Sequence, residues 1–379
     1  MTEAPGSTGA NLRLARQARG FSQQQLASMA GVSRQAVSAV ESGHSDPSLR
    51  VALAIAQALG LSVEELFGPG QPAAPVLATS VAPVTSASLR VTLASVGERF
   101  VALPLRGDSG AGLGFLPAGG LTVPASGAVM ARSAGYAAHV NGGAAATDLI
   151  AVRPIGPPRP TLVVAGCDPA LPLLATPLSL LDPPVAFAWW PCGSAKALRL
   201  AQAGLVHAAG VHAQGGNGTL LPDDAQVVGF TAWREGLAVR PSLKSTVTGL
   251  DSVARHRLRI VNREPGAEAR RLLDAERERL GLDSADLAGY GTQAAGHLQV
   301  ASAVAAGLAD VGVASEPAAR AYGLAFVPMA EEQFSLVIPA AQAASREIQA
   351  LFRVLTSPWL LAQLASLPGY DATTCGDRL

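Results

Sequence analysis

Serine and glycine divide the first 67 residues into short segments of regular spacing. Each serine stands where its side chain can cap the start of a helix, and each glycine stands where a helix can end. These punctuating residues are Ser22, Ser33, Ser48, Gly20, Gly31 and Gly43. The spacing predicts helices over residues 11–19, 23–30, 34–42, 48–59 and 63–67. We therefore expect an all-α domain over residues 1–68, with a shared core that contains Leu26, Ala30, Val32, Val37 and Val40.

The segment FSQQQLASMAGVSRQAVSAVESGHSDPSLRVALAIAQALGLSVEELF resembles helix-turn-helix domains of the phage-repressor (Cro, or xenobiotic-response-element) class in helix order, spacing and capping. The resemblance covers the whole domain. It implies a five-helix DNA-binding fold whose third helix enters the major groove. On that helix Val37 and Val40 face inward, which leaves Arg34, Gln35 and Ser38 facing outward. An arginine can pair with guanine and a glutamine with adenine, so these side chains are the expected base readers.

Two more side chains join the expected DNA contacts. Gln23 begins the second helix, where it can bond a phosphate, and Ser33 begins the third. The alternative is that Arg34 and Gln35 are simply solvated surface. Glu41 is better explained as a structural partner than as a base reader. Residues 11–67 hold five arginines against four carboxylates, so one copy would bind DNA weakly. We therefore expect a homodimer on a palindromic double-stranded operator.

The composition of the whole chain narrows the function classes. The 379 residues carry no net charge, and 15% of them are charged, which excludes a generally basic nucleic-acid coat protein. The length indicates two or three domains. The N-terminus has no apolar signal-peptide core, and no run approaches the ~20 apolar residues of a membrane span, so we expect a cytoplasmic protein with no membrane partner. The three cysteines have neither metal-ligand spacing nor a disulfide pattern.

The composition changes twice in the middle of the chain. Residues 69–88 are rich in proline, alanine, serine and threonine, which is typical of a linker. Residues 89–158 alternate apolar and polar positions between glycine-rich turns, which predicts a small β-rich module of unknown role. A second linker-like stretch, PIGPPRP, follows at 154–160.

Strands and helices alternate from residue 161 onward. The sequence predicts strands at 162–165, 185–190, 226–230, 258–261, 311–313 and 334–338. It predicts helices at 171–181, 194–203, 267–280, 296–307 and 341–357. This rhythm is typical of α/β layers with mainly parallel sheets.

The same region, residues 159–379, resembles the periplasmic-binding-protein-like domains that occur fused to helix-turn-helix regulators and to molybdopterin-biosynthesis proteins. The stretches that carry the resemblance are VVAGCDPALPLLA, CGSAKALRLAQAGLVHAAGVH, GFTAWREGLAV, RIVNREPGAEARRLLD and GYGTQAAGHLQVASAVAAGLADVGVASEPAARAYGLAFVPM. The resemblance implies two α/β lobes around a ligand cleft, with the chain crossing near 230–239 and returning near 334–339. It also implies molybdate, tungstate or a molybdenum-cofactor-related molecule as effector.

Three strand-to-helix turns place small residues at helix N-termini, where backbone N–H groups suit a small polar or anionic ligand. With the loop that closes the far side, the expected ligand residues are Cys167, Asp168, Gly193, Ser194, Arg234, Pro265, Gly266, Ala267, Thr292, Gln293 and Glu316. Relatives usually carry a Gly-Ser-Gly-Thr-Arg loop where this chain has Gly-Ala-Glu-Ala-Arg. If Glu268 points into the cleft, the ligand is neutral or cationic; if it points away, an oxyanion remains suitable.

Other roles stay open at this point. Gly193 and Ser194 can be only a helix cap, and Arg234 can be a surface residue. His207 and His212 lie in an apolar run and are more often core residues than metal ligands. Trp189 and Trp190 could stack on a ring-bearing ligand. The sequence holds no catalytic motif beside its cysteines, so we expect no catalytic residue, no metal and no cofactor. The effector can equally be an organic metabolite, and the less favoured alternative is a molybdopterin-biosynthesis enzyme.

Overall fold

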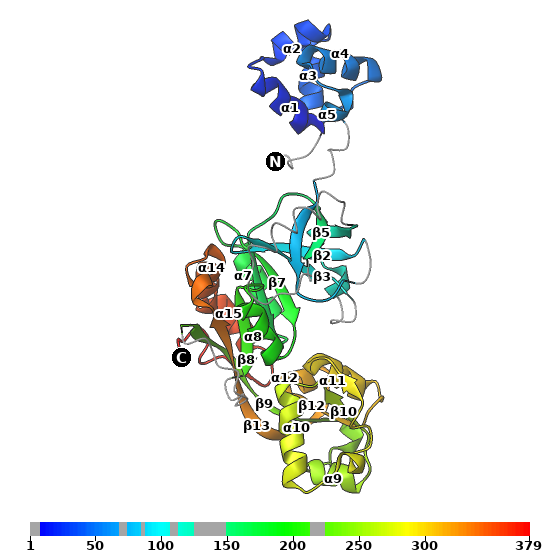
Figure 1. The fold of residues 1–379 in the computed structure, drawn as a ribbon, viewed down its shortest axis with the longest axis vertical. Helices are drawn as coiled ribbons and strands as arrows, with labels where there is room; N and C mark the ends of the chain where they lie inside the picture. The colour runs from blue at the N-terminus through cyan, green and yellow to red at the C-terminus, as the bar shows by residue number, and fades with distance from the viewer. Residues whose placement is uncertain (1–7, 68–73, 85–87, 107–112, 125–148, 213–223) are drawn as a thin grey trace. The chain divides into compact units, whose positions relative to one another are not determined.

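The computed structural model describes residues 8–67, 74–84, 88–106, 113–124, 149–212 and 224–379 (Figure 1). The chain divides into two compact units, residues 1–74 and 75–379. No helix among the described residues combines the length and apolarity that crossing a bilayer requires.

The first unit consists of short helices close to the predicted ones, except that the first helix begins three residues earlier than predicted. They are α1 (Thr8–Ala18), α2 (Gln23–Ala30), α3 (Arg34–Glu41), α4 (Leu49–Leu59) and α5 (Val63–Phe67). The side chains of Ser22, Ser33 and Ser48 each accept a backbone N–H three residues later. Gly31 and Gly60 end α2 and α4 with φ of 64° and 61°, a left-handed conformation that glycine adopts without strain. The buried core contains Leu12, Leu26, Ala27, Val37, Val40, Ile55, Ala56, Leu59 and Leu66.

A buried ion pair ties α1 to the end of α3. Arg16 donates from Nε to Glu41 Oε1 at 2.6 Å and from Nη2 to Oε2 at 3.0 Å. Glu41 also accepts from Gln23 Nε2 at 2.8 Å, and Arg16 donates from Nη1 to the Phe21 carbonyl at 2.6 Å. Glu41 is therefore a structural partner, as the sequence indicates.

The second unit begins with a closed barrel. Its strands are β1 (Val76–Ser80), β2 (Arg90–Val96), β3 (Arg99–Pro104), β4 (Gly120–Val123) and β5 (Leu149–Pro154), in the order β1-β3-β2-β4-β5. A short 3₁₀ helix, η2 (Leu113–Phe115), precedes β4. The barrel interior holds Ala78, Val91, Leu93, Ala102 and Val152. The linker predicted over 69–88 is wrong at its centre, because β1 lies inside that range and pairs with both β3 and β5.

The remaining strands of the second unit form a nine-stranded sheet among the described residues. They are β6 (Thr161–Gly166), β7 (Ala186–Pro191), β8 (Ala208–His212), β9 (Gln226–Val239), β10 (Ile260–Arg263), β11 (Gln293–Ala294), β12 (Val311–Ser315), β13 (Ala325–Ile338) and β14 (Tyr370–Asp371). The order is β11-β10-β12-β9-β13-β8-β6-β7, and β14 pairs with β9. The expectation of mainly parallel pairing is wrong at the centre, where β9 and β13 run antiparallel to each other and to β12 and β8.

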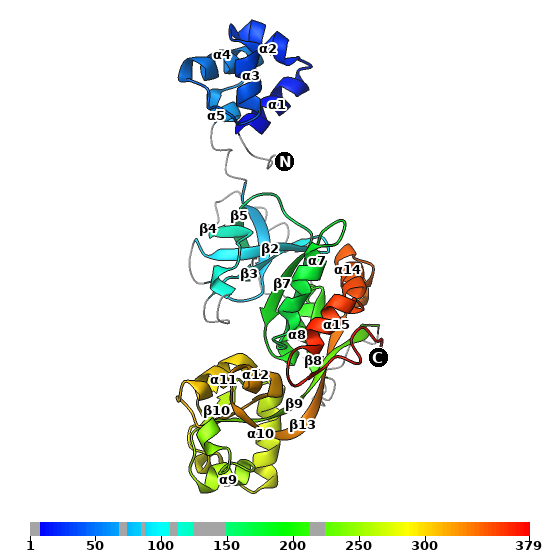
Figure 2. The same ribbon diagram turned by 180° about the vertical axis from the view of Figure 1, so that it is seen from behind.

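Two lobes share this sheet, and the long strands β9 and β13 run through both (Figure 2). The first lobe carries η4 (Leu171–Leu174), α7 (Ala175–Ser179), α8 (Ser194–Gln202), α13 (Ala340–Ala343), α14 (Arg346–Leu355) and α15 (Pro358–Ala365). The second lobe carries η5 (Pro241–Leu243), α9 (Leu250–Arg255), α10 (Glu268–Arg279), η6 (Ser284–Asp286), α11 (His297–Ala305) and α12 (Glu316–Ala321). Lobes joined by antiparallel strands can change their separation by a small twist of those strands.

The barrel and the first lobe share one hydrophobic core. Val96, Val101 and Leu103 of the barrel belong to the same buried cluster as Val163 and Val211 of the sheet. Since this cluster is continuous, the barrel is part of the second unit and is not a free module.

Local differences from the predicted elements have simple causes. The predicted helix 171–181 is the 3₁₀ turn η4 followed by α7. The predicted helix 341–357 breaks in two because the Ser345 side chain accepts the Ile348 N–H and starts α14 anew. Strand β8 was not predicted, since its residues are small and apolar without alternation.

Candidate nucleic-acid interface and ligand cleft

The exposed face of α3 carries the side chains expected to contact DNA. Arg34, Gln35 and Ser38 are exposed, while Val37 and Val40 are buried in the core of the first unit. Ser33 is also exposed, and its hydroxyl accepts the Ala36 N–H at 3.1 Å. The face therefore presents a guanidinium, a carboxamide and a hydroxyl together, which is a set of groups suited to base edges.

Gln23 differs from the expected phosphate contact in one respect. It is only partly exposed, and its amide nitrogen donates to Glu41 Oε2 at 2.8 Å. The side chain is therefore held against α3 by its amide nitrogen, which is the group that could have donated to a phosphate.

A cleft of about 940 Å³ lies between the two lobes of the second unit. The first lobe contributes aromatic and sulfur side chains to its wall, including Phe187, Trp189, Trp190, Cys167 and Cys192. The second lobe contributes Arg263, Glu264, His297, Ser302 and Tyr322. The wall is therefore mostly apolar, with a few polar groups from both lobes, which is the usual make-up of a small-molecule site.

Two of the predicted helix N-termini face each other across the lobes. A Cβ on Gly193 would lie 3.4 Å from the Gly266 carbonyl oxygen and 3.6 Å from Ala267 Cα. These two turns are therefore in contact with each other, and little space remains between them. The predicted loop residue Pro265, next to Gly266, is exposed.

Asp168 and Ser194 hold other protein groups. The buried Asp168 carboxylate accepts from Thr231 Oγ1 at 2.6 Å, from Tyr370 OH at 2.6 Å and from the Ala170 N–H at 2.8 Å. Ser194 Oγ accepts the His212 N–H at 3.2 Å. Both side chains therefore support the first lobe near Cys167, which itself lines the cleft.

Among the predicted residues on the far side, Arg234 and Glu316 pair with each other. Arg234 donates to Glu316 from Nε at 2.7 Å and from Nη2 at 2.8 Å, and Glu316 also accepts from Arg320 at 3.0 Å. Thr292 and Gln293 are exposed, and Gln293 extends the sheet as part of β11. Glu268 pairs with Arg271 on its own helix, with Arg271 Nε 2.8 Å from Oε1.

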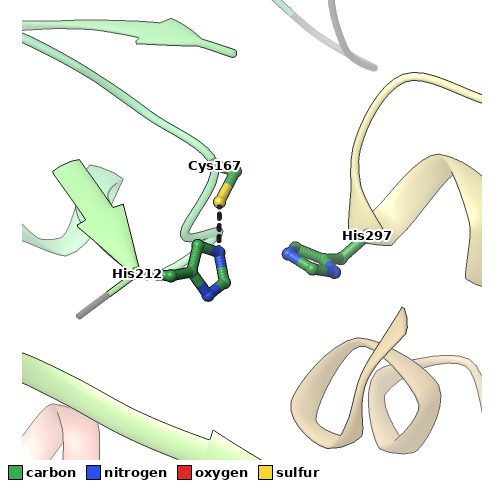
Figure 3. Close-up of side chains that lie close together, drawn as sticks. All are labelled: Cys167, His212 and His297. Carbon is green, nitrogen blue, oxygen red and sulfur yellow. Dashed lines mark hydrogen bonds between the residues drawn. The ribbon is translucent and has the colours of Figure 1, made fainter. Parts of the chain in front are cut away.

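A cluster that the sequence analysis missed lies where the lobes meet. Cys167 follows β6, His212 ends β8, and His297 begins α11 of the other lobe. Figure 3 shows Cys167 and His212 on one side, facing the imidazole of His297. Cys167 Sγ is 3.2 Å from His212 Nε2, and one ligand atom from each of the three residues lies within 4.8 Å of the other two. All three residues are buried.

A carboxylate from each long strand lies beside one of the two imidazoles. His212 Nδ1 lies 3.1 Å from Glu332 Oε2, and His297 Nδ1 lies 3.4 Å from Glu235 Oε1. Glu332 is on β13 and Glu235 is on β9, so both carboxylates come from the strands that cross between the lobes. Trp233 packs edge-on against both rings, with centroids 5.5 Å and 6.0 Å away.

The charges of the cluster are coupled. Burial alone would raise the pKa of the Cys167 thiol, but the imidazoles of His212 and His297 outweigh it and lower that pKa to about 6. Burial would lower the pKa of His212, whereas Cys167 and Glu332 raise it well above its usual value. Burial would raise the pKa of Glu235, yet His297 and His212 hold it below its ordinary value. The two imidazoles therefore favour the thiolate form of Cys167.

One polar atom of the cluster has no partner. His297 is 1% exposed, and among the described residues no hydrogen bond reaches its Nε2. Its Nδ1 lies 3.2 Å from both Ser315 N and Arg263 Nη1. Buried polar atoms are normally hydrogen-bonded or bound to a ligand, so the open Nε2 marks a position where a further group fits.

Comparisons with known proteins agree with this two-part organisation. The family model for helix-turn-helix domains matches residues 12–66, and the model for PBP superfamily domains matches residues 175–356. The uncharacterized protein YvgK of Bacillus subtilis (strain 168) is 33% identical over 143 residues, which are 38% of this chain and 46% of that protein. This chain thus spans about half the length of YvgK.

Two further similar proteins each match one of the two domains. An uncharacterized helix-turn-helix-type transcriptional regulator of Methanocaldococcus jannaschii is 41% identical over 56 residues, which are 15% of this chain and 85% of that protein. A solved structure of the tungstate ABC transporter from Geobacter sulfurreducens is 13% identical and covers 54% of this chain and 97% of that chain, with a TM-score of 0.43. This chain therefore belongs to the helix-turn-helix family of transcriptional regulators, and it joins that DNA-binding domain to a domain of the PBP superfamily.

Proposed function

We propose that this protein is a one-component transcription regulator. The first unit binds a double-stranded operator through α3, and the cleft of the second unit binds a small effector that alters the affinity for DNA. The observation that carries this proposal is the cleft of about 940 Å³ whose wall comes from both lobes. A ligand that touches both lobes stabilises one lobe separation over others, and such differential binding is what a sensor requires.

The working form on DNA is proposed to be a homodimer on a palindromic operator. Phosphate neutralisation supplies most of the affinity of such domains, and the first unit has few arginines to offer. Two copies double the number of phosphate contacts and read two half-sites about 34–36 Å apart. Arg34 and Gln35 would read bases within each half-site, with Ser38 and Ser33 beside them.

The cleft favours a ring-bearing organic effector over a bare oxyanion. Phe187, Trp189 and Trp190 supply flat apolar surface, and Lys196 Nζ lies 5.5 Å from the centroid of the Trp190 ring. The volume lies within the range of about 300–1,000 Å³ that organic ligands occupy. Molybdate or tungstate would fill a small part of it, and the turns at Gly193 and Gly266 leave little room between them. A molybdenum-cofactor-related molecule is one member of the favoured class.

A DNA-binding assay with the full chain tests the proposal. An operator is first selected from a random duplex library, and its affinity is then measured by fluorescence anisotropy with and without a candidate effector. Thermal shift identifies candidates beforehand, because a ligand that binds the folded chain raises its melting temperature by mass action. Molybdate, tungstate, phosphate and pterins form the first panel.

Two variants separate the two halves of the proposal. Arg34→Ala is expected to weaken operator binding and to leave the thermal shift unchanged. Trp189→Leu is expected to reduce the thermal shift and to leave effector-independent DNA binding unchanged. Failure to select any duplex would refute the DNA-binding half. A ligand that shifts the melting temperature without altering DNA affinity would refute the sensing half.

A further inference from the structure

We propose that Cys167, His212 and His297 bind one transition-metal ion of the zinc type, and that this ion joins the two lobes at the floor of the cleft. As a statement about the effector site, this inference rests on the proposed function; as a statement about metal binding, it rests on the geometry of the cluster. The ion would have three protein ligands, one sulfur and two imidazole nitrogens, and one open position.

The ligand set and its spacing suit such an ion. Thiolate and imidazole are the preferred donors of Zn²⁺ and of the neighbouring metals Co²⁺ and Cu⁺. With Zn–S of about 2.3 Å and Zn–N of about 2.0–2.1 Å, tetrahedral geometry places the donor atoms about 3.4–3.6 Å apart. The Cys167–His212 separation of 3.2 Å is already close to this value. The three donor atoms lie within 4.8 Å, so an approach of about 1 Å by His297 completes the set.

The groups around the ligands support the same conclusion. His212 has its Nε2 toward Cys167 and its Nδ1 beside Glu332, an arrangement in which the carboxylate orients the ring and leaves Nε2 free to bind a metal. His297 adds its unpartnered Nε2 as the third donor atom, while its Nδ1 accepts the Ser315 N–H at 3.2 Å and lies 3.4 Å from Glu235 Oε1. The thiolate and the two carboxylates offset the charge of a divalent ion in a buried site.

A nucleophilic role explains the cluster less completely. Cys167, His212 and Glu332 stand in the order of a nucleophile, a base and an orienting carboxylate. That role leaves His297 and its unpartnered Nε2 unused. A metal ion uses all three side chains.

The ion would couple ligand binding to lobe closure. Cys167 and His212 belong to the first lobe and His297 to the second (Figure 3). Coordination of all three side chains would therefore hold the two lobes together. Cys167 and His297 also line the cleft, so the open coordination position faces the space where the effector is proposed to bind. An oxygen, nitrogen or sulfur donor on the effector could fill that position.

Cobalt titration of the full chain tests the site. Protein treated with a chelator and then freed of it is titrated with Co²⁺ alone, and absorption is followed. The expected result is one ion per chain, with a thiolate-to-cobalt charge-transfer band in the near ultraviolet and strong visible bands of a four-coordinate ion. Absence of the charge-transfer band in the wild type would overturn the proposal.

Matched variants assign the ligands. Cys167→Ser should abolish the charge-transfer band, while Cys192→Ser, at another thiol that lines the same cleft, should leave it intact. Glu332→Gln, which changes a hydrogen-bond partner of a ligand, should weaken Co²⁺ binding about 10–100-fold. His297→Gln removes a ligand itself and should weaken binding further while the sulfur band persists. If Cys167→Ser does not fold, the His297→Gln result decides. Unchanged affinity in His297→Gln, or loss of the band in Cys192→Ser, would overturn the assignment.

The outcome separates this inference from the proposed function. Co²⁺ binding that needs Cys167 and His297 but leaves operator affinity unchanged supports the site and counts against its regulatory role. If the wild-type protein binds no Co²⁺ while an organic effector still alters its operator affinity, the regulator is supported and the metal site is refuted.

Discussion

Replacing Glu41 with alanine should destabilise the DNA-binding unit by several kcal/mol. The carboxylate accepts from Arg16 at 2.6 and 3.0 Å and from Gln23 at 2.8 Å, and Arg16 is 9% exposed. Removing one partner of a buried pair leaves the other charge uncompensated, at a cost of about 3–5 kcal/mol. At about 1.4 kcal/mol for each factor of ten, the population of opened first unit should rise about 150- to 4,000-fold.

Hydrogen–deuterium exchange of the full chain measures this change locally. The amides of α3 should exchange faster in Glu41→Ala by a factor of that size, while those of β9 should keep their rates. The control is the double variant Arg16→Met with Glu41→Leu, which removes both charges and should lose much less stability. Unchanged exchange in Glu41→Ala, or a double variant less stable than the single one, would refute the assignment of the pair as a coupled buried charge.

Three further expectations concern single side chains. Arg34→Ala should cost about 1–3 kcal/mol on the selected operator and relax specificity at one base position, whereas an equal loss on random DNA would assign Arg34 to a phosphate. Burial lowers the pKa of His207 to about 4, so the unfolded chain takes up a proton near the ordinary imidazole pKa of 6.5 and the folded chain does so only near 4. Stability should therefore fall as the pH drops from 6.5 towards 4, by up to about 3 kcal/mol, and His207→Gln should flatten this part of a urea-unfolding profile. Glu268→Gln should leave effector affinity unchanged by calorimetry, because the carboxylate pairs with Arg271 on its own helix, and a tenfold change would place it in the ligand site.

Local signals in the sequence determine most of the first unit. The capping serines and the left-handed glycines act within three or four residues of chain, so the sequence places α2 and α5 to the residue and α4 to within one residue. The outward direction of Arg34 and Gln35 follows from the same periodicity. Arg16 and Glu41 are 25 residues apart in the sequence, so no local pattern predicts their ion pair.

The candidate metal cluster depends on contacts that a single sequence does not show. Cys167 and His212 are 45 residues apart, and His297 comes from the opposite lobe. Motif spacing detects ligands that share one helix or loop, whereas these three meet only after the sheet has formed. The sequence placed His212 in an apolar run, and that was accurate for its burial. His297 lies near His212 in space, with Glu235 of β9 beside it, but no pattern in the sequence indicates that it belongs to a site.

The order in which the lobes appear along the chain bears on synthesis at the ribosome. Residues 240–324 of the second lobe form one continuous segment with buried clusters largely of their own, so this lobe can begin to fold as soon as it emerges. The first lobe needs Phe334, Leu336, Ile348, Leu351 and Leu360, which pack on Leu162 and Val164 from much earlier in the chain. The sheet of this lobe therefore stays incomplete, with apolar surface exposed, while more than a hundred intervening residues are translated. Chaperone demand during synthesis should therefore fall on the lobe that begins first and finishes last.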